Sequence, residues 1–241
     1  MNKASIKPWF MVVARLFLFA GIQGILALVF FLNKTANAWE TSANWWPLVV
    51  AMTNLICLAF LIRFFKVEGK RYWDLFRIER PTLKQDLLTM LGLLVLIAPI
   101  GFLPNILLGN WLFGDSMTTL NMIVRPLPYW AAIAGILLFP ITQGLVEVAT
   151  YFSFVMPQFE KQGMRPWLAL GLPVLFLSLQ HIAVPLLFDG RYILWRALMF
   201  LPFALLLGFV MRWRPRLLPY LAILHVLMDL SLPIMFLGVA Y

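Results

Sequence analysis

The chain has 241 residues, of which 63% are hydrophobic and only 12% are charged. Its mean hydropathy of +0.89 excludes an ordinary soluble domain and predicts an all-α polytopic membrane protein. The formal net charge of +9 does not indicate nucleic-acid binding, because the basic residues cluster at the ends of apolar runs, as membrane topology requires. The single cysteine, Cys57, excludes an intrachain disulfide.

Apolar runs of about twenty residues, long enough to span a bilayer as helices, occur seven times along the chain. They cover residues 9–32, 45–64, 87–110, 129–157, 166–188, 191–211 and 217–240. The first run is too long for the apolar part of a signal peptide, so we expect a retained first helix. We interpret residues 1–241 as a single membrane domain, with three amino-terminal helices in 1–110 and a four-helix core in 129–240.

Several residues within these runs carry local information. Pro99, Gly101 and Pro104 interrupt the third run and Pro140 interrupts the fourth, so we expect kinks there. Arg15 lies toward one end of the first run. From that position its long side chain is predicted to snorkel to the lipid headgroups.

Lysine and arginine are distributed unevenly between the two sides that a seven-span path defines. Fourteen fall on the side of the amino terminus, namely Lys3, Lys7, Arg63, Lys66, Lys70, Arg71, Arg77, Arg80, Lys84, Lys161, Arg165, Arg212, Arg214 and Arg216. The opposite side has only Lys34, Arg125, Arg191 and Arg196. This asymmetry predicts a cytoplasmic amino terminus and an external carboxyl terminus in a bacterial plasma membrane. The basic segment 66–86 is interpreted either as a helix lying along the headgroups or as a solvated loop.

Four ionisable side chains lie deep inside apolar runs, where a charge costs several kcal/mol unless it is paired, hydrated or neutralised. They are Glu147 in the fourth run, His181 in the fifth, and His225 and Asp229 in the seventh. Each could be an isolated packing residue, but one shared polar site accounts for all four more economically. His225 and Asp229 are four residues apart and share a helix face. A carboxylate with imidazoles suits the activation of water, either directly as a general base or through a metal ion.

Three stretches around these residues resemble the motifs E-E-x-x-x-R, F-x-x-x-H and H-x-x-x-N/D of the CAAX-protease and bacteriocin-processing (CPBP, or Abi) family of intramembrane proteases. "EVATYFSFVMPQFE" resembles the first motif, "LFLSLQHIAVP" the second and "RLLPYLAILHVLMDL" the third. The resemblance covers residues 129–235. Val148, Phe152 and Leu177 stand where the family has its second glutamate, its arginine and its aromatic residue.

The resemblance implies an endopeptidase with a CAAX-protease-like core, which cuts membrane-associated or lipidated peptides near the cytoplasmic leaflet. By the family pattern, Glu147 and His181 would activate the water, while His225 and Asp229 would stabilise the oxyanion. In a metal-dependent form, Glu147, His181 and His225 would hold a divalent ion such as zinc. Because Phe152 cannot replace the arginine, compensating positive charge is expected from His181, His225 or a bound cation. The expected partners are membrane lipids and a peptide substrate.

Two other functions stay open. The replacements at Val148 and Phe152 favour a pseudoenzyme, which would bind a partner or a lipid-linked peptide without cleaving it, as an immunity protein does. Alternatively, the buried acid and histidines would relay protons in a transporter. The lack of an internal repeat counts against the transporter.

Overall fold

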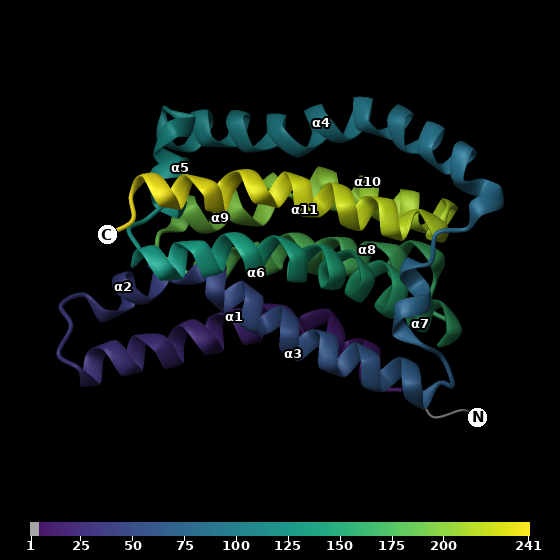
Figure 1. Ribbon diagram of the computed structural model, residues 1–241, viewed down its shortest axis with the longest axis horizontal. Helices are drawn as coiled ribbons and strands as arrows, with labels where there is room; N and C mark the ends of the chain where they lie inside the picture. Colours follow the sequence, from purple (N-terminus) through teal and green to yellow (C-terminus); the bar gives the residue numbers. More distant parts are fainter. Residues whose placement is uncertain (1–4) are drawn as a thin grey trace.

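The computed structural model describes residues 5–241, and every regular element within them is helical. The long helices run side by side, and the start of α1 lies at the opposite end of the bundle from the carboxyl terminus (Figure 1). Lys3, one of the fourteen basic residues counted above, lies outside the described residues. In chain order the helices are α1 (Lys7–Leu32), α2 (Ala38–Asn44), α3 (Trp46–Val67), α4 (Leu83–Phe113), α5 (Ser116–Ile123), α6 (Tyr129–Val148), α7 (Met156–Lys161), α8 (Pro166–Leu179), α9 (Gly190–Met199), α10 (Leu201–Trp213) and α11 (Leu218–Met235). A π-helical segment, η3 (Ala149–Val155), joins α6 to α7, and the remaining short turns are η1 (Tyr72–Phe76), η2 (Arg80–Thr82), η4 (Gln180–Ile182), η5 (Pro215–Leu217) and η6 (Phe236–Gly238).

Six helical stretches of the described chain are long and apolar enough to cross a membrane. They are Lys7–Leu32, Trp46–Val67, Tyr72–Phe113, Tyr129–Lys161, Gly190–Trp213 and Pro215–Gly238. This finding confirms the prediction of an all-helical bundle with the composition of a membrane protein. The predicted run 166–188 is helical only over Pro166–Ile182, about 26 Å at ~1.5 Å per residue, which is slightly shorter than the roughly 30 Å hydrocarbon core of a bilayer.

The basic connection 66–86 is not a surface helix. α3 continues to Val67, the chain then forms the short turns η1 and η2, and α4 begins at Leu83. Tyr72, at the start of η1, is buried, and its hydroxyl donates a hydrogen bond to the carbonyl oxygen of Leu145 on α6. The connection is therefore tied to the helix that carries Glu147.

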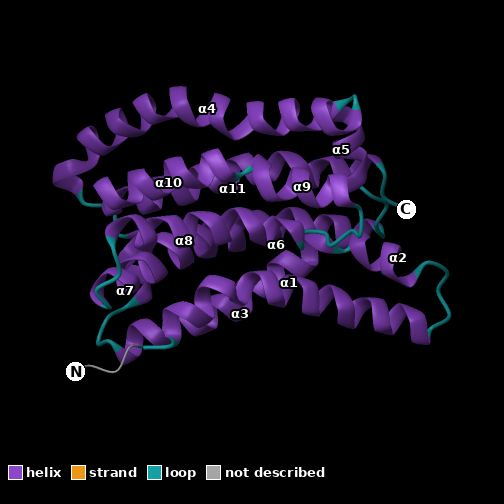
Figure 2. Ribbon diagram, turned by 180° about the vertical axis from the view of Figure 1, so that it is seen from behind, coloured by secondary structure: helices purple, strands orange, loops and turns teal. Residues whose placement is uncertain are grey.

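α4 is the long helix least enclosed by protein. In the stretch Tyr72–Phe113, which contains α4, only 11% of the most apolar 18-residue segment is buried. The corresponding value for the stretch from α6 to α7 is 61%. It packs against α5, α9 and α10 and lies over the other helices along one side of the bundle in both views (Figures 1 and 2). Pro99 and Pro104, predicted to interrupt this run, lie inside the continuous helix. Much of α4 is thus free to face lipid.

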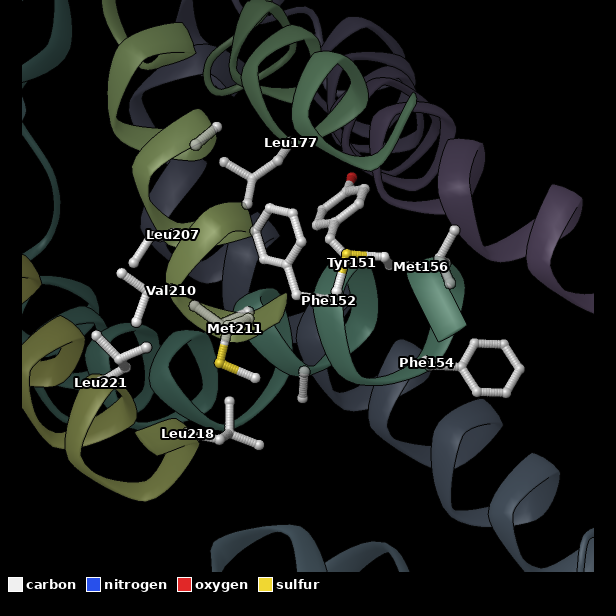
Figure 3. Packing of buried hydrophobic residues seen from close by; sticks show 14 of the residues in the cluster. Tyr151, Phe152, Phe154, Met156, Leu177, Leu207, Val210, Met211, Leu218 and Leu221 are labelled. Atoms are coloured by element: carbon white, nitrogen blue, oxygen red, sulfur yellow. The ribbon is translucent and has the colours of Figure 1, made fainter. Parts of the chain in front are cut away.

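Phe152, the residue at the arginine position of the family motif, packs in the apolar core. Its side chain is 1% exposed and lies among Tyr151, Leu177 and Met211 (Figure 3). A Cβ on Gly208 of α10 would approach the Phe152 ring to 3.0 Å, so the absence of a side chain at Gly208 makes room for the ring. Phe152 is therefore a packing residue.

α6 and α11 approach each other closely at Gly144. A Cβ at this position would lie 2.6 Å from Cγ2 of Val226 and 2.7 Å from the carbonyl oxygen of Ala222. Real Cβ atoms do not tolerate such distances, so any other residue would displace α11. Since Gly144 lies one helical turn before Glu147, and Val226 follows His225, this contact positions the acid relative to the imidazole.

Candidate functional site

Glu147 is buried near the middle of the helical stretch from α6 to α7, with 2% of its surface exposed. Its Oε1 accepts hydrogen bonds from Nε2 of Gln143 and Nε2 of Gln180, both at 2.6 Å. At ~1.5 Å per residue, Glu147 lies about 27 Å from the start of α6 and about 21 Å from the end of α7. The site therefore lies in the interior of the bundle, slightly nearer to its basic end than to the opposite end.

Arg15 does not snorkel to a membrane surface, so that prediction was wrong. Its side chain is fully buried, and Nη2 lies 3.6 Å from Oε1 of Glu147. The guanidinium donates hydrogen bonds to three amide oxygens, Oε1 of Gln180, Oδ1 of Asn54 and Oε1 of Gln143. A buried arginine is tolerated when its donors meet acceptors and an opposite charge lies close by. Arg15 therefore belongs to the polar centre around Glu147.

Two glutamines join Arg15 to Glu147. Gln143 and Gln180 each present the amide oxygen to the guanidinium and the amide nitrogen to the carboxylate. Each glutamine oxygen accepts one further hydrogen bond: Oε1 of Gln143 from Nδ2 of Asn54 at 3.0 Å, and Oε1 of Gln180 from the hydroxyl of Tyr151 at 3.1 Å. Because each amide is held at both ends, the network fixes Oε1 of Glu147 in place.

His225 lies between two carboxylates. Its Nε2 is 3.3 Å from Oε2 of Glu147 and 3.3 Å from Oδ2 of Asp229. This Asp229 oxygen is buried and has no hydrogen-bond partner within residues 5–241. A proton on Nε2 of His225 can therefore be directed to either acid.

His181 lies in η4, directly after the end of α8. Its Nδ1 is 2.9 Å from the carbonyl oxygen of Leu177, so Nδ1 carries a proton and donates it to that carbonyl. In the neutral ring this leaves Nε2 as an acceptor, 3.8 Å from Oε1 of Glu147. The ring also packs on Phe200, with centroids 4.0 Å apart.

Arg196 was predicted to be one of the basic residues on the external side, and this prediction was also wrong. It is buried and donates hydrogen bonds to the carbonyl oxygens of His181 and Val184. It therefore does not mark a membrane surface but holds the segment that follows His181.

The structure brings together all four ionisable residues singled out in the sequence. Glu147 contacts both histidines, and His225 contacts Asp229. The sequence analysis missed the surrounding polar residues, which are Arg15, Asn54, Gln143, Tyr151, Gln180 and Arg196. Some signals were present, since Gln143 lies four residues before Glu147 and Gln180 adjoins His181.

A cavity of about 100 Å³ lies beside this cluster. Its polar lining comes from Gln143, Glu147, His181, Arg196, His225 and Asp229, and its apolar lining includes Trp46, Phe139 and Phe203. Because a buried water needs only roughly 10–15 Å³ of such space and several polar partners, the cavity can hold several waters. Oε2 of Glu147 is the oxygen not engaged by the two amides, so it is the one able to bind such a water.

The donors do not point to a metal centre. Residues 5–241 contain no group of three His, Cys, Asp or Glu side chains placed to hold a metal ion. The guanidinium of Arg15 lies 3.6 Å from Oε1 of Glu147, where it would repel a cation bound to that oxygen. Zinc binding by Glu147, His181 and His225 stays a prediction.

Together the fold and the site define a class of protein: a bundle of membrane-type helices with a buried acid–imidazole centre beside an internal cavity. Comparisons of the chain with protein-family models, with curated proteins and with solved structures find no match.

Proposed function

We propose that this protein is an intramembrane endopeptidase of the CPBP type, which hydrolyses peptide bonds of membrane-associated or lipidated peptides. The observation that carries the proposal is the asymmetric setting of Glu147. One carboxylate oxygen is held by Gln143, Gln180 and Arg15, while the other lies beside His225 at a cavity large enough for water. A fixed carboxylate whose second oxygen faces a space for water is the arrangement that a general base requires.

The proposed reaction begins with a water bound between Glu147 and His181. Nε2 of His181 accepts one hydrogen bond from this water and orients it, while Glu147 removes a proton as the water oxygen attacks the substrate carbonyl carbon. Nε2–H of His225 donates a hydrogen bond to the oxyanion that forms, a contribution worth ~10²–10³ in rate for one donor, and Asp229, whose Oδ2 lies 3.3 Å from the same nitrogen, keeps the ring protonated. Glu147 then delivers its proton to the departing amine, and the carbon–nitrogen bond breaks.

Arg15 supplies the positive charge that the family places on the arginine of its first motif. The sequence analysis expected this charge from His181, His225 or a bound cation, whereas the guanidinium comes from α1. An ionised carboxylate in a dry interior is strongly unfavourable without a partner. The Arg15–Glu147 pair allows Glu147 to stay ionised, as a general base must be.

The membrane arrangement that accompanies this function has seven crossings, with α8 as the short fifth one. The amino terminus lies in the cytoplasm and the carboxyl terminus outside, in the plasma membrane of a bacterium, and residues 129–240 form the CAAX-protease-like core. The start of α1 and the carboxyl terminus lie at opposite ends of the bundle (Figure 1), which supports an odd number of crossings.

One observation favours a proton-coupled transporter as a second candidate. Glu147, His225 and Asp229 form a chain of contacts at 3.3 Å that could pass a proton across the bundle interior. A transporter would move its substrate without cutting a peptide bond. A pseudoenzyme would bind the same peptides that we propose as substrates and leave them intact.

The experiment compares the peptide termini found in membranes of cells that express the wild type or Glu147→Gln. We expect a set of new termini that requires the wild-type carboxylate. Glu160→Gln is the matched control, because Glu160 lies at the end of the bundle in an ion pair with Arg212 and should leave these termini unchanged. Identical termini with wild type and Glu147→Gln would exclude the peptidase and leave the transporter or the pseudoenzyme.

A further inference from the structure

A second cavity, of about 340 Å³, lies beside the site between α4, α5, α9 and α11. α4 contributes Phe102, Asn105 and Ile106 to its lining, and α11 contributes Met228, Ser231 and Met235. Its volume falls within the roughly 300–1,000 Å³ typical of ligand pockets. We call this space the α4–α11 groove.

The groove and the site cavity share part of their lining. Gly101, Arg196, Phe200, Met228, Asp229 and Leu232 border both. At this shared border Gly101 of α4 faces Met228 of α11, where a Cβ on Gly101 would lie 3.4 Å from Cε of Met228, and we call this point the Gly101–Met228 constriction. A methionine side chain is unbranched and changes rotamer readily, so the Gly101–Met228 constriction can widen without movement of a helix.

Both cavities extend toward the end of the bundle that carries the carboxyl terminus. On α6 the lining of the site cavity extends from Glu147 back to Phe139, and on α11 it extends from His225 forward to Leu232. The main-chain nitrogen of Tyr129, at the start of α6, bonds the carbonyl oxygen of Tyr241 at 2.8 Å. The residues predicted to face the cytoplasm lie at the other end.

The lining of the groove is mixed. Alongside Phe, Ile and Met side chains it contains the amide of Asn105 and the hydroxyls of Ser116, Thr119 and Ser231. Oδ1 of Asn105 accepts a hydrogen bond from Nε1 of Trp195, and the hydroxyls of Thr119 and Ser231 donate to main-chain carbonyls of their own helices, so the amide NH₂ and the hydroxyl oxygens are the groups left to bind a ligand. A lipid tail has no donors or acceptors for hydrogen bonds, whereas the main chain of an extended peptide has a donor and an acceptor at nearly every residue. The groove chemistry therefore fits a peptide better than a lipid tail.

We infer that an extended, largely apolar segment of a polypeptide reaches Glu147 through the α4–α11 groove and the Gly101–Met228 constriction. The inference rests on the proposed peptidase function and specifies its substrate route. By the predicted orientation, the peptide comes from the outer half of the membrane. This differs from the cytoplasmic leaflet that the family resemblance implies.

The first test fills the constriction. Gly101→Phe adds a ring against Met228, while Gly92→Phe adds the same ring on the same helix where a Cβ would have no neighbour within 4 Å. With a substrate found by the terminus comparison, kcat/KM should fall at least about tenfold for Gly101→Phe and stay within about twofold for Gly92→Phe. Wild-type cleavage by Gly101→Phe, with Glu147→Gln inactive, would overturn the route and leave the peptidase intact.

The second test measures occupancy without cleavage. The full chain carrying Glu147→Gln is mixed in proteoliposomes with an apolar peptide that bears a benzophenone group, and the crosslinked residues are mapped. We expect crosslinks on α4 and α11 around Asn105 and Ser231. In the double variant with Gly101→Phe, only the crosslinks to residues beyond the constriction should be lost. The inference would be overturned by crosslinks spread evenly over the lipid-facing helices. It would also be overturned if a photoreactive phospholipid, but not unlabelled peptide, displaced the crosslinks.

Discussion

Nη2 of Arg15 on α1 lies 3.6 Å from Oε1 of Glu147 on α6, and both side chains are buried. The pair joins the first helix to the polar centre, far away in sequence. It also explains how a carboxylate can lie within an apolar run, because the guanidinium and two amides together replace the solvation that Glu147 loses.

Arg15→Met should strongly destabilise the protein. Removing one partner of a buried pair leaves an uncompensated charge, which costs about 3–5 kcal/mol. The double variant Arg15→Met with Glu147→Gln should recover a large part of that loss, because it removes both charges. Unfolding in detergent measures the effect.

The control for this pair is Arg125→Met. Arg125 pairs with Glu40, whose side chain is 55% exposed, and an exposed pair of this kind contributes less than about 1 kcal/mol. Equal losses of stability for Arg125→Met and Arg15→Met would contradict the role given to the buried pair.

Gly144→Ala should separate α11 from α6. The added methyl would collide with Val226 and with the main chain at Ala222, so we expect a loss of about 1–3 kcal/mol in stability, as in overpacked cores. Cleavage should fall as well, because the collision lies between Glu147 and His225. Gly171→Ala is the control, since a Cβ on Gly171 would meet nothing within 4 Å; it should stabilise α8 slightly. Full activity in Gly144→Ala would show that the spacing of the two helices is not critical.

His225 and Asp229 should act as one unit. If both support the oxyanion, replacing either with Ala should lower the rate by about 10²-fold or more. Once one of the two residues is replaced, little of their joint stabilisation of the oxyanion remains for the second replacement to remove. The double variant should therefore be much more active than the product of the two single effects predicts. Small effects that simply multiply would indicate two independent packing residues.

The polar centre was only half predictable from the sequence. Four residues stood out in the sequence, namely Glu147, His181, His225 and Asp229. Burying an ionisable group inside an apolar run costs free energy whichever helices the run packs against. Arg15 was misplaced because its position in the run does not reveal which face of α1 meets the other helices. Gln143 and Gln180 carry no charge, and their positions four residues before Glu147 and next to His181 do not by themselves show that they link Arg15 to Glu147.

The fold shows the same division. Helix lengths follow from apolar runs, which is why the all-helical architecture was predicted correctly. The α4–α11 groove depends on which face of α4 is left without a partner, and the proline positions alone do not determine that. The short turns of the basic connection were missed because Tyr72 is buried against α6, a tertiary contact with no local signature.

The carboxyl terminus should lie outside the cytoplasm. The uneven distribution of lysine and arginine predicts it, and the proposed substrate route from the outer half depends on it. A reporter that is active only in the cytoplasm, fused after Tyr241, should be inactive, and one that requires export should be active. The reverse result would place the α4–α11 groove in the cytoplasmic half.

Activation of water by Glu147 is the central claim, and isotope transfer from heavy-oxygen water tests it most directly. Purified protein in proteoliposomes cleaves an identified substrate in labelled water, and mass spectrometry follows one labelled oxygen into each new carboxyl group. The wild type should incorporate the label, Glu147→Gln should neither cleave nor incorporate it while remaining folded, and Glu147→Asp should retain little activity because its carboxylate withdraws by one methylene. Label incorporation by Glu147→Gln at the wild-type rate would contradict the account.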